Sequence, residues 1–338
     1  MLAADVAPRS RRRRRLPSML AMTAIVGVFA ATGMLIAARK TIDSVGRVPN
    51  VSTHLSPGGS SIENFLLVGS DSRAGADPTA ADAGGIGTEA DVSGHRSDTI
   101  MILRRDKSTG DASLLSIPRD LWVQVPGHDG KRRINSAFND GPEVLVQTLQ
   151  QELGLPIHHY VEIDFSGFKS LVDALGGVQI CVNYATRDVS TGLNITEPGC
   201  HILDGVQALA YARSRHYEEF REDEQWHEDP ASDIGRTKRQ QQFVNLALQS
   251  ALDRIKVDPF SAGRLATTIG SALRVDDELD PIAAASSLRS AVDAGIATYS
   301  LPVFGKTIGG NAVLLLGDGS DAVLAYFRGE GPAPAPNA

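Results

Sequence analysis

A run of arginines at positions 11–15 precedes residues 16–38, which contain no charged side chain. A helix of that length rises about 35 Å at about 1.5 Å per residue, enough to cross a hydrocarbon core of about 30 Å. A cleaved signal peptide is the alternative, because the segment ends in Ala37 and Ala38. The length favours a retained transmembrane helix.

The flanking charges predict how this helix is oriented. Six arginines precede it, namely Arg9 and residues 11–15, whereas only Arg39 and Lys40 follow closely. Because basic residues favour the cytoplasmic side, we predict a cytoplasmic tail at 1–15 and an extracytoplasmic body after the helix at 16–38. The expected location is therefore the cell membrane, with a single span.

The body of the chain is acidic. The 338-residue chain has a formal charge of -7, and residues 41–338 alone carry 25 basic and 39 acidic residues, a balance of -14. Such a domain repels nucleic acid, so the N-terminal arginines indicate topology rather than a DNA-binding arm. Any cationic site in this body must be local.

Cys181 and Cys200 are the two cysteines of the chain, and both lie in the predicted exported part. An oxidising compartment favours their pairing, and the segment between them, with Thr191, Gly192 and Pro198, reads as a loop that a disulfide would hold. Two unrelated buried thiols are the alternative. No spacing of histidine and cysteine indicates zinc.

Apolar strands alternate with helices along the body. Strands are predicted at residues 64–69, 99–105, 112–117, 160–165, 178–182, 297–302 and 313–316. Helices are predicted at residues 142–153, 168–175, about 235–255 and 321–328. This alternation predicts a single α/β domain, which we place at residues 62–329.

Irregular stretches interrupt and flank this pattern. Residues 39–61, rich in Ser, Pro and Gly from 48 onward, are predicted to be a juxtamembrane spacer, and residues 330–338 a disordered tail. The 74–94 and 218–233 stretches are long enough to be functional lids or disordered insertions. Trp226 in the second stretch could stack on a sugar, or serve as a lid residue or surface anchor.

Charged residues follow the predicted strands. Asp71 and Arg73 come after strand 64–69, at the carboxyl edge where open α/β sheets bind ligands, and Asp71 is a candidate metal ligand. Arg96 and Asp98 are two residues apart and share one face if the backbone is extended. Arg119 follows Pro118, whose ring stiffens the presentation of its charge.

More cationic and amide groups occur later in the chain. Arg213 and Arg215 alternate, so an extended backbone would direct both side chains the same way. Arg236 and Gln240 continue the buried stripe of helix 235–255 backward in steps of four, toward a helix N-terminus that favours anions. Arg133 is a further candidate from a loop.

Each of these arginines alone could be a solvated or ion-paired surface charge. Together they would leave a site near +2, counting Arg73, Arg96, Arg119, Arg213 and Arg215 against Asp71, Asp98 and Asp120. Burying unpaired guanidinium groups is costly, whereas charge-assisted hydrogen bonds to phosphate contribute about 1.5 to 3 kcal/mol each. With Mg²⁺ held by paired aspartates, the implied ligand is a pyrophosphate.

Six ordered motifs resemble those of the LytR-CpsA-Psr family of bacterial cell-wall ligases, over about residues 65–247. They are VGSDSR from Val68, RSDT from Arg96, IPRD from Ile117, INSAF from Ile134, YARSR from Tyr211 and RTKRQQ from Arg236. The resemblance implies a three-layer α/β/α sandwich with a central mixed sheet. It also implies an apolar pocket for the lipid tail of a polyprenyl pyrophosphate.

The resemblance further assigns roles at matching positions. Asp71 and Asp98 are the expected ligands of Mg²⁺, with Mn²⁺ as the alternative metal, and both are candidate catalytic residues together with Arg96 and Arg119. The expected pyrophosphate contacts are Arg73, Arg96, Arg119, Arg133, Arg213, Arg215, Arg236 and Gln240, although the family often has lysine at the position of Arg133. The cysteine pair resembles that of actinobacterial members, whose polymer is often arabinogalactan.

The expected function is therefore a phosphotransferase that moves a glycopolymer, such as arabinogalactan, from a polyprenyl-pyrophosphate carrier onto peptidoglycan. Its expected partners are the lipid-linked donor, the peptidoglycan acceptor and the membrane. A pyrophosphatase would use the same cluster with water as the acceptor. A non-enzymatic receptor or regulator would need no paired metal aspartates.

Overall fold

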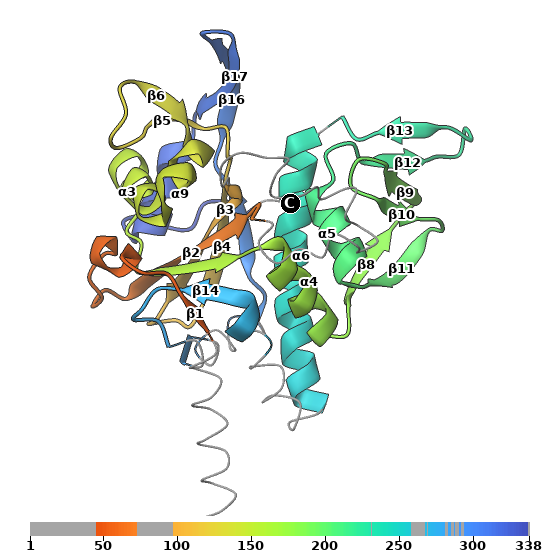
Figure 1. Ribbon diagram of the computed structural model, residues 1–338, viewed down its shortest axis with the longest axis horizontal. Coiled ribbons are helices and arrows are strands. Elements are labelled where there is room, and N and C mark those ends of the chain that lie inside the picture. The colour runs from red at the N-terminus through yellow and green to blue at the C-terminus, as the bar shows by residue number, and fades with distance from the viewer. Residues whose placement is uncertain are drawn as a thin grey trace, which may run out of the picture.

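The computed structural model describes residues 45–72, 97–230, 232–257, 268, 270–280, 283–284, 287, 291 and 294–336. A seven-stranded mixed sheet forms its centre, so the predicted α/β fold with a central mixed sheet is confirmed (Figure 1). In spatial order the strands are β1 (Gly46–Arg47), β14 (Leu273–Val275), β7 (His159–Ile163), β2 (Ile62–Ser70), β3 (Ser97–Asp106), β4 (Ala112–Ile117) and β15 (Ala297–Ser300). Parallel pairing joins β1 to β14, β2 to β7 and β4 to β15, and the other pairs are antiparallel.

Both faces of this sheet are apolar. Leu66, Ile102 and Leu115 are fully buried on one face, beneath α3 (Pro142–Leu153) and α9 (Ser320–Arg328). The neighbouring residues in the same strands point to the opposite face, where Val244 and Leu248 of α6 (Ser232–Val257) pack. Helices on both faces explain why these strands read as continuous apolar runs.

A smaller β region lies beside the central sheet, on the far side of α6 (Figure 1). It contains an antiparallel four-stranded sheet, in the order β10 (Leu193–Ile195), β9 (Ala185–Asp188), β12 (Glu218–Phe220) and β13 (Trp226–Glu228). The pair β8 (Val178–Val182) and β11 (Gly199–Leu203) and the helices α4 (Phe165–Ala174) and α5 (Gly205–Arg213) complete it. A second hydrophobic cluster joins these elements to Phe243 of α6.

Two hairpins and two short 3₁₀-helices complete the described structure. The hairpins are β5 (Trp122–Gln124) with β6 (Lys131–Arg133), and β16 (Val303–Ile308) with β17 (Asn311–Leu316). The 3₁₀-helices are η1 (Val51–His54) and η3 (Ile134–Asp140). The second hairpin projects from the body at the top of Figure 1.

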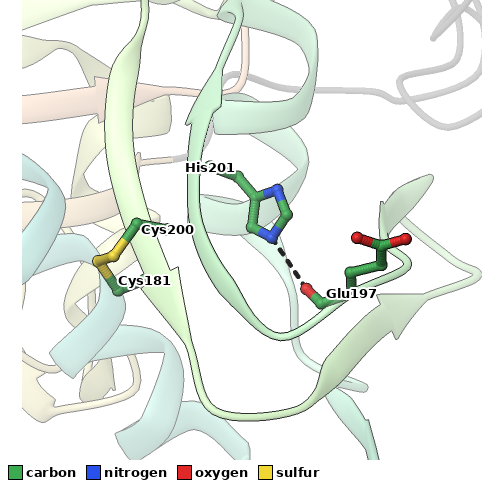
Figure 2. Close-up of a disulfide and its surroundings, with 4 residues drawn as sticks. All are labelled: Cys181, Glu197, Cys200 and His201. Atoms are coloured by element: carbon green, nitrogen blue, oxygen red, sulfur yellow. Dashed lines mark hydrogen bonds between the residues drawn. A yellow bond between two sulfur atoms is a disulfide. The ribbon is translucent and has the colours of Figure 1, made fainter.

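The predicted disulfide is confirmed. Cys181 of β8 and Cys200 of β11 are paired directly across the two strands, with their Cα atoms 3.9 Å apart (Figure 2). The prediction of a loop between them was wrong, because the segment contains β9 and β10. Leu193 and Ile195 of β10 are buried in the second cluster, and this burial stabilises strands that are too short to be seen from periodicity.

Two other local predictions were wrong. Residues 218–233 are not a long loop, because β12 pairs with both β9 and β13.

Residues 211–213 are not extended, because they form the last turn of α5. Asp204 caps that helix by accepting a hydrogen bond from the Gln207 amide, and alanines within it favour helix.

The stretch expected as a spacer is part of the folded body. β1 joins the central sheet beside β14, and Val48 and Val51 are buried in the first cluster. The fold therefore starts before residue 48 rather than near residue 62.

Several predictions fall outside the described residues. These are the transmembrane helix at 16–38, the 74–94 stretch, and Arg73 and Arg96. In the part of the chain that is described, no helix has both the length and the apolar character of a bilayer span.

Removing the disulfide should destabilise the β region. The bridge joins residues 19 positions apart, and closing such a loop contributes about 3 kcal/mol in the chain-entropy account. We expect the double variant C181S/C200S to unfold at a lower urea concentration than the unmodified chain. A reductant should produce the same shift in the unmodified chain and none in the variant. Equal midpoints for the two proteins would contradict this expectation.

Candidate functional site

A cavity of about 570 Å³ lies between the central sheet and helices α4, α5 and α6. Most of its wall is apolar, with Leu67, Phe168, Phe243, Val244 and Leu248 among the lining residues. Of the described residues that line it, three are arginines and one, Asp164, is acidic. The Asp164 carboxylate caps α4 by accepting a 2.7 Å hydrogen bond from the Gly167 amide. The charged part of the wall is therefore cationic.

Helix α6 lines the cavity with polar residues near its N-terminus and with apolar residues further along. Arg236 and Gln240 lie near its N-terminus, and Val244 and Leu248 follow at the same four-residue spacing. The Gln240 amide donates a 3.2 Å hydrogen bond to the Ala212 carbonyl, which joins α6 to α5. The structure therefore places both predicted residues on the cavity wall, next to an apolar stripe.

Arg213 and Arg215 also line the cavity. The Arg213 guanidinium carbon lies 4.5 Å from the centre of the Phe165 ring, a cation–π distance. Their expected extended backbone is absent at Arg213, which ends α5, yet both residues reach the cavity. Ser214 between them is fully buried and is not among the residues that line the cavity.

The buried carboxylate of Asp188 organises this segment. It accepts hydrogen bonds from the Ser214 hydroxyl at 2.7 Å and from the Arg215 and His216 amides at 3.0 Å each. It also accepts from the amide and hydroxyl of Ser190. Burial acts to raise the pKa of Asp188, but these hydrogen bonds outweigh it and hold the pKa below its usual value.

Sequence reasoning missed Asp188, which occupies an inward position of β9 beside the fully buried Thr186. The sequence carries no local signal for this role, because the donors that allow the carboxylate to be buried include residues 214–216, far along the chain.

Arg239 and Gln241, the neighbours of Gln240 on α6, hold this helix against the β region and the central sheet. The Arg239 guanidinium donates to the Ser214 carbonyl at 2.8 Å and pairs with Asp229 at 3.1 Å. Gln241 donates to the Tyr299 carbonyl at 2.7 Å and to the Ser116 hydroxyl at 2.9 Å, at the end of β4. Helix α6 is thus tied to both the central sheet and the β region where it meets the cavity.

The predicted metal ligands lie at the ends of two adjacent strands, Asp98 within β3 and Asp71 directly after β2. In the β2–β3 pairing, Gly69 faces Thr99 and Ser70 faces Ser97, so Asp98 occupies a β-bulge. Asp71 directly follows Ser70, which lines the cavity. The side chain of Asp98 lies outside what the structure describes, and its predicted role stays a prediction.

These residues suit a hard divalent ion. Among the described residues, no three His, Cys, Asp or Glu side chains gather as a complete metal site. Mg²⁺ commonly takes one or two protein carboxylates and completes its shell with water and substrate phosphates. The carboxylate chemistry of Asp71 and Asp98 is compatible with that ion, and the metal stays a prediction.

Arg119 and Arg133 do not line the cavity. They lie on either side of Asp120, with nitrogen-to-oxygen distances of 3.6 and 3.5 Å. Arg133 also donates to the Ala312 carbonyl of β17 at 2.8 Å. Of the predicted arginines that the structure describes, Arg213, Arg215 and Arg236 line the cavity, whereas Arg119 and Arg133 belong to this second cluster. The roles of Arg119 and Arg133 stay predictions.

The arrangement at the cavity suits an amphipathic anion. Cationic and amide groups gather at one end, and the apolar wall continues from there along α6. A ligand with an anionic headgroup and a hydrocarbon chain would satisfy both parts.

Comparison with known proteins agrees with this type of site. The LytR_cpsA_psr family profile matches residues 32–323. The chain belongs to this family.

Individual relatives support the assignment. Over 275 residues the chain is 35% identical to LcpB of Corynebacterium glutamicum, described as a probable cell wall biosynthesis protein. That alignment covers 78% of this chain and 61% of LcpB, so this chain spans less than two thirds of LcpB. The polyisoprenyl-teichoic acid–peptidoglycan teichoic acid transferase TagU of Oceanobacillus iheyensis is 31% identical over 254 residues, which cover 73% of this chain and 69% of TagU.

A solved structure has a similar fold. The LytR-Csp2A-Psr enzyme from Actinomyces oris superposes with a TM-score of 0.63 and 26% sequence identity. The superposition covers 84% of this chain and 95% of that enzyme.

Asp188→Asn should destabilise the protein in a pH-dependent way. The variant loses the buried acceptor of several donors, and we expect the free energy of unfolding at pH 7 to fall by about 2 kcal/mol. Because the folded-state pKa of Asp188 is lowered, its contribution is complete above the unfolded-state pKa of about 3.9 and is lost as the pH falls through the folded-state value.

Urea denaturation at pH 7 and at successively lower pH measures this difference. Asp111→Asn, at an exposed position on the β3–β4 turn, is the matched control and should change stability little. A difference between wild type and Asp188→Asn that is constant over the whole acid range would contradict the account.

Proposed function

We propose that this protein transfers a glycopolymer from a polyprenyl-pyrophosphate carrier onto peptidoglycan. The observation that carries this proposal is the cavity, in which Arg213, Arg215, Arg236 and Gln240 meet a long apolar wall. Membership of the LytR-CpsA-Psr family and the likeness to TagU support it, since TagU is named for a polyisoprenyl-linked donor and a peptidoglycan acceptor.

The cationic residues bind the diphosphate. Guanidinium groups donate in a planar fork that matches phosphate oxygens, and their hydrogen bonds strengthen where water is excluded. Asp188 and Arg239 hold the 214–216 backbone in place, so the site is ordered before the substrate arrives. The prenyl chain packs against Phe243, Val244 and Leu248.

The transfer itself exchanges the phosphoanhydride bond of the diphosphate for a phosphate ester bond to the acceptor. A sugar hydroxyl of peptidoglycan, the muramic acid 6-hydroxyl by family resemblance, attacks the phosphorus nearest the polymer. A new bond forms between phosphorus and the acceptor oxygen, the diphosphate bridge breaks, and polyprenyl phosphate leaves. Arginines stabilise the charge that develops on the departing oxygen. Asp71 is a candidate to orient the hydroxyl and to accept its proton.

Asp71 and Asp98 would hold the divalent ion that we propose as cofactor. When bound, Mg²⁺ would neutralise part of the diphosphate charge, as it does in other phosphoryl-transfer sites. Arg96, Arg119, Arg73 and Arg133 are the further diphosphate contacts that the motifs predict.

The polymer that we propose is arabinogalactan or a similar wall polysaccharide. The balance of -14 over residues 41–338 favours a weakly charged polymer over a strongly anionic one. We also propose a membrane-anchored protein with its catalytic body outside the cytoplasm. The uncharged segment at 16–38 and the disulfide, which persists in oxidising compartments, support this location.

Replacing single cavity residues should slow transfer. With full-length protein, a lipid-linked glycan donor and peptidoglycan, we expect Arg213→Ala and Gln240→Ala to lower the transfer rate about ten- to a hundredfold, because each loses contacts worth about 1.5 to 3 kcal/mol. Arg132→Ala removes an exposed arginine of β6 and should transfer at the wild-type rate.

Mass spectrometry of the products separates the possible reactions. Polymer joined to peptidoglycan indicates transfer, whereas free polymer phosphate indicates hydrolysis. Undiminished transfer in both cavity variants would contradict the proposed function.

A further inference from the structure

The four-stranded sheet of the β region has one buried face and one face open to solvent. Thr186 and Asp188 of β9 point inward and are fully buried, as are Leu193 and Ile195 of β10. Arg187 lies between the two β9 residues and therefore points outward. The pairing of Arg187 with Glu218, and of Ala185 with Phe220, extends this outward face onto β12.

Aromatic and charged side chains form a platform on this outward face. Phe220 pairs across the strands with Trp226, and their ring centres lie 5.3 Å apart. The Arg187 guanidinium carbon lies 3.9 Å from the Trp226 ring centre, and its Nε donates a 2.7 Å hydrogen bond to Glu218. Phe220 itself is 39% exposed, so its ring is available to a ligand.

The platform is continuous with the mouth of the cavity. Glu228, which pairs with Glu218, bonds to the His216 imidazole at 2.8 Å. His216 and Ser190, at the turn that follows β9, both line the cavity. A ligand that leaves the cationic end of the cavity therefore meets this sheet.

The chemistry of the platform fits a sugar. The C–H groups on one side of a pyranose or furanose ring carry partial positive charge, which suits the negative face of an aromatic ring. Arg187 and Glu218 are held side by side and supply a donor and an acceptor for hydroxyl groups.

The charge around the platform limits which glycan can bind. Residues 218–229 contain seven acidic residues against one arginine, and the balance stays acidic when Arg187 of the platform is counted as well. A polymer that carries phosphate or carboxylate groups would be repelled here, whereas an uncharged polysaccharide would not.

We propose that the outward face of β9, β12 and β13, with Arg187, Glu218, Phe220 and Trp226, is a subsite for the uncharged glycan chain of the donor. This inference rests on the proposed function. It adds a binding site for the glycan part of the donor, which lies outside the cavity. The subsite selects neutral polymers over anionic ones.

Trp226 offers a direct readout. In the W122F background Trp226 is the only tryptophan, so its fluorescence reports on the platform. We expect oligosaccharides released from arabinogalactan to change this fluorescence with a saturable dissociation constant. That constant should weaken at least about tenfold in Phe220→Ala. Phe304→Ala, which removes an exposed ring from the β16–β17 hairpin, should leave it unchanged.

Two further ligands test selectivity. A ribitol phosphate oligomer and a disaccharide-peptide fragment of peptidoglycan should each bind at least about tenfold more weakly than the neutral oligosaccharide. Glu222→Gln with Glu224→Gln should strengthen binding of the ribitol phosphate oligomer and leave neutral binding unchanged. Absence of neutral binding, equal binding by Phe220→Ala, or equal binding of either anionic ligand would overturn the proposal.

A glycan-free prenyl pyrophosphate separates this inference from the proposed function. It should bind equally well to wild type and to Phe220→Ala, because the platform contacts sugar only. If the wild-type protein does not bind it, the proposed function fails. If it binds while the neutral oligosaccharide does not, only the subsite is wrong.

Discussion

The rest of the site depends on helix α6, which packs against both the central sheet and the β region. Val244 and Leu248 of this helix pack toward the central sheet, while Phe243 and Ala247 pack into the second hydrophobic cluster. The cavity lies between these two apolar regions. The apolar side chains of α6 that face both of them form part of its wall. The same stripe is polar at its N-terminal end, so the helix that builds the apolar wall also supplies Arg236 and Gln240 to the cationic end of the cavity.

The cationic groups at this end are held by a network rather than by their own packing. Asp188 binds the 214–216 segment through its backbone and through Ser214, and Arg239 binds the Ser214 carbonyl from α6. A buried carboxylate is tolerated only when it is well supplied with donors, and here those donors belong to the segment that carries Arg213 and Arg215. Preorganisation of this kind reduces the ordering cost when an anion binds.

Much of this fold could be predicted from the sequence, because its main elements are long and strongly patterned. The bounds predicted for β4, β8 and α3 match those observed, since apolar runs, Pro142 and Gly154 mark their limits. The β12–β13 hairpin could not be predicted, because its strands have three residues each and depend on pairing with β9 about 30 residues earlier. Asp188 was missed for a related reason, since its role depends on contacts with residues 214–216 that no local pattern reveals.

The cavity residues were found despite an error in local structure. The alternation of Arg213 and Arg215 suggested an extended backbone, whereas Arg213 ends a helix and Ser214 turns the chain. Both arginines still line the cavity, together with Arg236 and Gln240 from α6. Their charge was a better guide than their spacing, because basic side chains in an acidic domain mark a local cationic site whatever the local backbone conformation.

A crystal structure of the protein with a bound polyprenyl pyrophosphate would test this account most directly. The account predicts the diphosphate within hydrogen-bonding distance of Arg213, Arg215, Arg236 and Gln240, with the prenyl chain along Val244 and Leu248. A diphosphate bound at another surface, or a prenyl chain that lies outside the cavity, would contradict it.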